Sequence, residues 1–123
     1  MRSVHTGSWD NVLEVLGIDL TSLLITGEEN IGVARRKLLE YDNDPHNLPD
    51  EVAERFNFIS KTLKYLAGSF NDKGLHDWFL RKRAQLNDLR PTDILKGNWK
   101  PEDPEPQKVL KLAEETYGGQ SAT

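Results

Sequence analysis

The chain has 123 residues, 37% of them hydrophobic and 29% charged, which suffices for one hydrophobic core and is short for two independent ones. A formal net charge of −4 excludes a protein that binds nucleic acid through a broad basic surface. The absence of cysteine excludes disulfides, cysteine-based zinc sites and thiol nucleophiles. No apolar run is long enough for a signal peptide or a membrane span, so we expect a soluble, cytoplasmic protein.

The first forty residues carry helical patterns. Residues 9–16 place their apolar side chains on one helix face, and Gly17 predicts the end of that helix. A short second helix begins at Asp19 and carries three leucines. The Thr-x-x-Glu spacing at 26–29 is typical of a capping box and predicts the start of a third helix, which ends near Asp42.

Residues 42–49 combine turn formers with two prolines and predict the main internal boundary. We therefore expect helix-turn-helix-like N-terminal helices over 1–48 and one compact unit over 49–123. The most regular apolar pattern follows the boundary, since six apolar residues between Val52 and Phe70 recur at alternating steps of four and three. This pattern predicts the buried central helix.

Shorter elements fill the rest of the chain. We predict a short helix from Asn71 or Asp72, a loop over 84–90, a short helix over 91–95, an extended connector over 99–106, and a last helix over 109–117 that Gly118-Gly119 ends. The core is expected to be complete by Leu95. No strand pattern appears, so the fold class is all-α, a single compact helical domain of about six or seven helices.

The sequence offers little for enzymatic chemistry, and we expect no enzyme. The three histidines, His5, His46 and His76, lie in separate local contexts, and none forms an i, i+4 pair that would put two metal ligands on one helix face. Nucleophile and phosphate-binding motifs are absent. We therefore expect no catalytic residue, no metal and no cofactor.

Two predicted helices, over 19–25 and 28–40, have the lengths of a helix-turn-helix. The recognition helix would open with Glu28 and Glu29, whose carboxylates would face DNA phosphates. The sequence thus predicts a degenerate helix-turn-helix with poor affinity for DNA. Candidates for contact with the DNA backbone are Arg35, Arg36 and Lys37, for which a solvated helix face is the alternative interpretation.

The most informative segment extends from Leu75 to Leu95. An aromatic pair is followed by a polar loop with a lone leucine, and then by a proline that leads into Ile-Leu. The aromatic pair would anchor the segment to the long helix, the leucine would fix the loop, and the proline suits the first turn of a helix. These positions are Trp78, Phe79, Leu86, Pro91, Ile94 and Leu95.

This segment resembles the toxin-binding domain of Xre/MbcA/ParS-type antitoxins, in which a Trp-Leu pair precedes a loop, a lone Leu, and then Pro and an acidic residue before Leu-Leu. The resemblance is specific from Leu75 to Leu95 and weaker elsewhere. The N-terminal helices are similar to a degenerate Xre-like helix-turn-helix. The chain departs from the family pattern at Arg81-Lys82-Arg83, where the family usually has Thr-Pro-Asn.

The resemblance implies a type II antitoxin that binds and neutralises a RES-domain toxin, an enzyme that degrades NAD or uses it, by occluding the toxin's active site. The partner is then the toxin, and the antitoxin forms a homodimer or a hetero-oligomer with the toxin. The resemblance also implies that the antitoxin autoregulates its operon. Residues 101–123 hold two basic and five acidic residues, which suits a site that binds dinucleotide phosphates. Candidate toxin-binding residues are Leu112, Glu114, Glu115, Tyr117, Arg81, Arg83 and Asn87.

Two other functions stay open at this point. One is a DNA-binding helix-turn-helix repressor, and the other is a helical adaptor that kept the fold without a toxin. An acidic tail that serves solubility is the alternative interpretation of residues 101–123.

Overall fold

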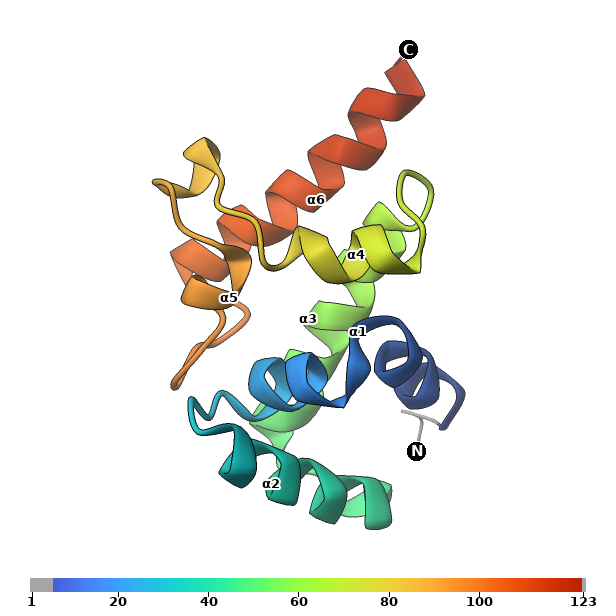
Figure 1. The fold of residues 1–123 in the computed structure, drawn as a ribbon, viewed down its shortest axis with the longest axis vertical. Coiled ribbons are helices and arrows are strands. Elements are labelled where there is room, and N and C mark those ends of the chain that lie inside the picture. The colour runs from blue at the N-terminus through green and yellow to red at the C-terminus, as the bar shows by residue number, and fades with distance from the viewer. Residues whose placement is uncertain (1–5, 123) are drawn as a thin grey trace.

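The computed structural model describes the backbone of residues 6–122 and the side chains of residues 10–44 and 46–116. This part of the chain is all-α, as predicted, with six α-helices, two short 3-10 helices and no strand (Figure 1). The α-helices are α1 (Thr6–Thr26), α2 (Ile31–Asn43), α3 (Asp50–Leu66), α4 (Asp72–Trp78), α5 (Pro91–Ile94) and α6 (Pro104–Ala122), and the 3-10 helices are η1 (Pro45–Asn47) and η2 (Ala84–Leu86).

Helix α1 consists of two helical segments that meet at Gly17. This glycine has φ 81° and ψ 163°, a conformation that side chains with a Cβ avoid, so the chain turns there as the sequence predicts. The second segment ends at Gly27, which has φ 76° and donates its N–H to the Leu23 carbonyl oxygen at 2.9 Å. Glycine therefore defines both the kink and the end of α1.

The capping box predicted at 26–29 is wrong. Thr26 is the last residue of α1, and its hydroxyl donates to the Ser22 carbonyl oxygen at 2.6 Å and accepts the Glu28 N–H at 3.1 Å. Asn30 caps α2 instead, because its side-chain oxygen accepts the Val33 N–H at 3.1 Å. The turn from Gly27 to Asn30 thus separates the two helices.

Helix α3 is the buried central helix that the apolar pattern predicts. It packs against α1 on one side and α6 on the other, and Figure 1 shows it running through the middle of the molecule. Five of the six patterned residues are buried and Phe70, beyond the end of the helix, is partly buried. The five are Val52, Phe56, Ile59, Leu63 and Leu66.

Helix α6 begins earlier and ends later than predicted. Pro104 and Pro106 both lie in its first turn, where the missing proline N–H has no carbonyl to bind in any case. Gly118-Gly119 do not end the helix, which continues to Ala122. A glycine ends a helix when it adopts a positive φ, and the glycines with positive φ in the described residues are Gly17, Gly27 and Gly97.

The core is not complete at Leu95, contrary to the expectation from sequence. Val109 and Ala113 of α6 are fully buried, and Trp99 is 4% exposed. The proline-rich connector and the first three turns of α6 therefore belong to the core. The same core includes buried residues of α1, α2 and α3, so the boundary predicted at 48/49 lies within one compact domain.

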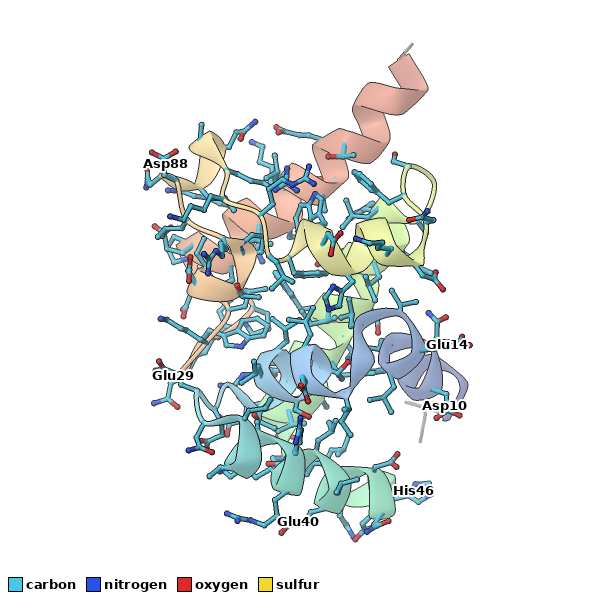
Figure 2. All side chains as sticks on the ribbon, viewed as in Figure 1. Asp10, Glu14, Glu29, Glu40, His46 and Asp88 are labelled. Atoms are coloured by element: carbon cyan, nitrogen blue, oxygen red, sulfur yellow. The ribbon has the colours of Figure 1, made fainter. Side chains whose placement is uncertain are left out.

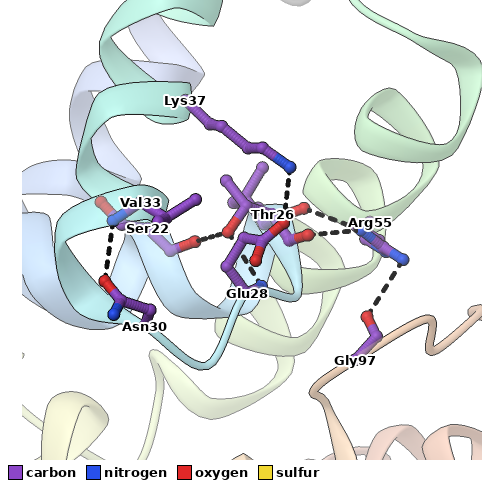
Figure 3. Close-up of polar contacts among 9 residues, drawn as sticks. Ser22, Thr26, Glu28, Asn30, Val33, Lys37, Arg55 and Gly97 are labelled. Atoms are coloured by element: carbon purple, nitrogen blue, oxygen red, sulfur yellow. Dashed lines mark hydrogen bonds and ion pairs between the residues drawn. The ribbon is translucent and has the colours of Figure 1, made fainter.

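A buried arginine joins α1 to the connector (Figure 3). Arg55 of α3 is 4% exposed and donates to the carbonyl oxygens of Thr26 and Trp99, both at 3.0 Å. The Trp99 indole N–H in turn donates to the Leu24 carbonyl oxygen at 3.0 Å. The guanidinium thus satisfies carbonyl groups at the C-terminus of α1, where the helix dipole favours a cation.

No helix within the described residues is long and apolar enough to cross a membrane.

Candidate partner-binding surface

The base of the candidate surface is the aromatic pair at the end of α4. Trp78 is 2% exposed and Phe79 is fully buried. Their rings pack edge to face, with centroids 5.3 Å apart and planes at 81°. Leu75, one turn earlier, is also buried, so the short helix presents an apolar face to the core as its sequence predicts.

Residues 80–90 form a structured loop on this base, called the 80–90 loop below. An antiparallel bridge joins Arg83 and Leu89, with the Arg83 N–H donating to the Leu89 carbonyl oxygen at 3.1 Å. Asn87 and Asp88 turn the chain with φ 59° and 64°, a conformation that Asn and Asp tolerate better than most residues. Leu86 is 1% exposed and fixes the loop to the core, as the sequence predicts.

The outer side of the 80–90 loop combines apolar and cationic groups. Leu80 is 44% exposed and Leu89 is 40% exposed. Arg81, Lys82 and Arg90 are exposed beside them. Exposed leucines surrounded by arginines are more typical of a binding surface than of a loop that faces only solvent.

Arg83 is half-buried and lies over the Trp78 ring, with its guanidinium carbon 4.8 Å from the ring centroid. One terminal N–H donates to the Trp78 carbonyl oxygen at 3.4 Å, while Nε has no acceptor within the described residues. Burial, and then the positive charge of Arg81, lower the pKa of Arg83 from its ordinary value. The side chain is therefore held in place and keeps an unused donor.

Helix α5 closes the segment. Its first residue, Pro91, is buried, and the Arg90 N–H donates to the Asp93 carboxylate at 2.9 Å. The Thr92 N–H donates to the Phe79 carbonyl oxygen at 3.1 Å, which ties α5 to the aromatic pair. Leu95 is buried and Ile94 is partly buried, so all six motif positions predicted to pack inward are buried or partly buried.

The predicted C-terminal contact residues lie on α6, which packs against η2 and α5. Glu114 and Glu115 are exposed. Leu112 is partly buried against the core. Less of its side chain is therefore available to a partner than the sequence suggests. The side chain of Tyr117 lies outside the described residues. Figure 1 shows the last turns of α6 extending beyond the rest of the domain.

The structure brings these two groups of predicted residues to one end of the molecule. Arg81, Arg83 and Asn87 belong to the 80–90 loop, and the contact between η2 and α6 sets that loop beside the helix. Figure 2 shows Asp88 at the tip of the loop, on the edge of the molecule. A partner that covers the loop would therefore lie beside α6.

The three basic residues proposed for DNA contact lie on α2, at the opposite end of the molecule, and two of them form ion pairs. Arg35 binds Asp19 of α1 at 2.6 Å. Lys37 binds Glu28 at 2.5 Å, a contact shown in Figure 3. The hydrogen bond to Glu28 raises the pKa of Lys37. Nearby carboxylates thus neutralise Arg35 and Lys37, whereas Arg36 forms no ion pair with any residue in the described part of the chain.

Arg55 and Trp99 are the residues that sequence reasoning missed. Arg55 lies on the apolar side of α3, three residues after Val52 and four before Ile59. A charged residue on a buried helix face is a signal for an internal polar contact. Trp99 stands in a proline-rich segment, and a tryptophan there is a signal for a connector fixed to the core.

The histidines and carboxylates of the described residues do not gather into a metal site. No group of three or more histidine, aspartate or glutamate side chains that could hold a metal ion occurs among them. His46 lies in η1 and His76 in α4, and His5 lies outside the described residues. The Asp77 carboxylate binds Lys73 at 2.8 Å and contacts His76 at 3.3 Å, and the hydrogen bonds from Lys73 and then from His76 lower the pKa of Asp77.

No family model matches this chain, and neither a curated protein nor a solved structure matches it significantly.

Proposed function

We propose that the protein is an antitoxin of the Xre/MbcA/ParS type, which binds a RES-domain toxin and blocks the toxin's active site. The observation that carries this proposal is the 80–90 loop, which exposes Leu80 and Leu89 among arginines. The loop rests on the motif residues from which the resemblance is drawn. The proposed activity is binding, and the chemistry belongs to the toxin.

The loop is suited to binding because it is already ordered. The backbone bridge between Arg83 and Leu89, the buried Leu86 and the stacking of Arg83 on Trp78 each restrict it. A surface that is ordered before contact loses little conformational entropy on binding. Leucine flanked by arginine provides an apolar contact within a ring of charge, and arginine is enriched at such contacts.

The acids on α6 support occlusion of a nucleotide site. Glu114 and Glu115 are exposed near the end of the helix that leaves the domain. A site that binds a dinucleotide carries basic groups for its phosphates, and carboxylates compete for such groups. In this proposal the 80–90 loop provides affinity, and the end of α6 enters the active site.

Rescue of cell growth on co-expression with the adjacent gene product tests the proposal, with pull-down of the complex as a second measurement. Leu89→Asp and Arg81→Glu should each abolish or strongly reduce rescue and pull-down. Lys61→Glu is the matched control for charge, because Lys61 is exposed on α3, and it should leave both unchanged. Full rescue by Leu89→Asp and by Arg81→Glu would refute binding through this loop.

A double variant separates the role of α6 from that of the 80–90 loop. Glu114→Lys with Glu115→Lys should preserve pull-down, because the loop still binds, and should reduce rescue, because the phosphate-binding groups are no longer occupied. Equal loss of both measurements would instead make α6 part of the primary contact.

A further inference from the structure

A groove lies along α3 on the side that faces the first segment of α1 and helix α4. Its volume is about 700 Å³, which is within the range of small-molecule sites, roughly 300–1,000 Å³. The α3 side of the groove extends from Asn57 to Ala67, a length of about 15 Å along the helix axis. Helix α1 packs against both other helices, as Figure 1 shows. The groove is therefore elongated and has walls from three elements.

The inner part of the groove is apolar. Val12 of α1, Leu63 of α3 and Leu75 of α4 line it and are buried, and Val15 of α1 lines it and is partly buried. A ligand with an apolar body would remove more of this surface from water, which favours binding. The three helices thus supply one continuous apolar contact.

The outer part of the groove is cationic. Lys61 and Lys64 line it, are exposed, and lie one turn apart on the same side of α3. Neither lysine forms an ion pair within the described part of the chain. Asp72 is the carboxylate in the lining; Asp10 and Glu14, labelled on α1 in Figure 2, do not line the groove. Two lysines and one aspartate give the lining a net charge of +1, whereas the whole chain carries −4.

A hydroxyl group in the wall has no hydrogen-bond partner. Ser60 lines the groove, and its Oγ is buried with no hydrogen bond to any described residue. A buried hydroxyl without a partner raises the free energy of the folded state. Rotation about χ1 would direct this hydroxyl to a ligand without breaking an existing hydrogen bond.

We propose that this groove binds a medium-chain fatty acid, a single carboxylate on an unbranched apolar chain. The ammonium groups of Lys61 and Lys64 hold the carboxylate, and the chain packs on Val12, Val15 and Leu75. The elongated wall of α3 favours an extended chain, and the net charge of +1 favours one carboxylate over several. The inference does not rest on the proposed toxin-binding function, and its binding test requires no toxin.

Titration of the isotope-labelled full chain with octanoate, followed by nuclear magnetic resonance, tests the site. Backbone N–H signals of Val15, Ser60 and Lys64 should shift, with a dissociation constant of about 1 mM or below. Octanol has the same chain length and no charge, so its dissociation constant should be about fivefold higher. The positions of the shifted signals distinguish this groove from other apolar surfaces.

A double lysine variant tests the recognition of the carboxylate. Lys61→Gln with Lys64→Gln should raise the dissociation constant for octanoate about fivefold and leave that for octanol unchanged. Lys82→Gln with Lys111→Gln is the matched control, because both residues are exposed and neither lines the groove. This control removes the same charge from the 80–90 loop and α6, and it should leave both dissociation constants unchanged.

Two single variants test the walls. Val15→Asp should raise the dissociation constant for octanoate at least about tenfold, because it replaces an apolar contact by a carboxylate that repels the ligand. Ser60→Ala should raise it about threefold through the loss of one donor. Circular dichroism checks that both variants stay folded.

Three outcomes would overturn the inference. Signals of the lining residues that stay unshifted up to about 10 mM octanoate would exclude the site. Equal dissociation constants for octanoate and octanol would exclude recognition of a carboxylate. Loss of growth rescue in the double variant Lys61→Gln with Lys64→Gln, without any binding of octanoate to the wild type, would assign the groove to a protein partner.

Discussion

Arg55 and Trp99 are 44 residues apart in the chain and contact each other twice in the fold. The guanidinium carbon of Arg55 lies 5.6 Å from the centroid of the Trp99 ring, and Nε donates to the Trp99 carbonyl oxygen at 3.0 Å. The Phe58 ring also packs edge to face against the Trp99 indole, with the two ring centroids 5.2 Å apart. The connector before α6 is therefore fixed to α3 by one cation and two aromatic rings.

Arg55→Ala should destabilise the protein by about 3 kcal/mol, because several buried carbonyl groups lose a charged donor at once. Arg55→Lys should cost less, about 1–2 kcal/mol, because an ammonium keeps the charge and cannot reach both the end of α1 and the connector. Urea denaturation measures both changes. Arg36→Ala on the exposed face of α2 is the control, with a change within about 0.5 kcal/mol. A similarly small change for Arg55→Ala would contradict the structural role of this residue.

Gly27 and Gly97 form a matched pair of substitutions. Both have positive φ, 76° and 66°, and the Gly97 N–H donates to the Gly27 carbonyl oxygen at 2.7 Å. Gly97→Ala should cost about 1 kcal/mol for the left-handed backbone alone, since a Cβ there would meet open space. Gly27→Ala should cost at least about 1 kcal/mol more, because its Cβ would collide with the Gly97 carbonyl oxygen. Thermal unfolding of the two variants measures the difference, and equal costs would mean that the contact between the two segments relaxes freely.

Trp78→Ala should destabilise the protein by about 3–5 kcal/mol, as for other large buried side chains. The residue is 2% exposed and supports both Phe79 and Arg83. Leu89→Ala, at 40% exposure, should cost less than about 1 kcal/mol. Chemical denaturation tests the pair, and a loss below about 1 kcal/mol for Trp78→Ala would indicate that the indole is accessible to a partner.

Two C-terminal deletions should behave differently. A chain that ends at Pro106 loses Val109 and Ala113 from the core, so it should no longer unfold cooperatively. A chain that ends at Thr116 keeps both residues and should stay folded, yet it should protect cells from the toxin less well because the end of α6 is gone. Circular dichroism melting and growth rescue check the two halves, and full rescue by the chain ending at Thr116 would exclude a role in toxin contact for residues 117–123.

Binding to random duplex DNA should be undetectable at micromolar protein and physiological salt. Asp19 and Glu28 already pair with Arg35 and Lys37, and Glu29 is exposed at the turn before α2, so phosphates would meet carboxylates. Fluorescence anisotropy with a labelled duplex makes the measurement. A clear rise in anisotropy, reduced by Arg35→Ala or Arg36→Ala, would contradict this expectation.

The helices and the buried positions of the motif follow from the order of apolar residues along the chain. Apolar residues at steps of three and four identify a helix face wherever burial is driven by area alone, which is why Val52 to Leu66 and the segment from Leu75 to Leu95 are packed as predicted. The kink in α1 is predictable from Gly17 as well, because the kink depends only on the backbone conformation of that residue.

The pairing of polar groups, in contrast, depends on the packing of the helices in three dimensions. Arg55 finds carbonyl oxygens from segments 29 to 44 residues away, and Asp19 finds Arg35 across a turn. Such pairings depend on how the helices are arranged in space, which periodicity does not encode. The same holds for α6, whose prolines and glycines suggested an early stop and a late start. Packing of Val109 and Ala113 against the core accounts for the early start of the helix at the prolines.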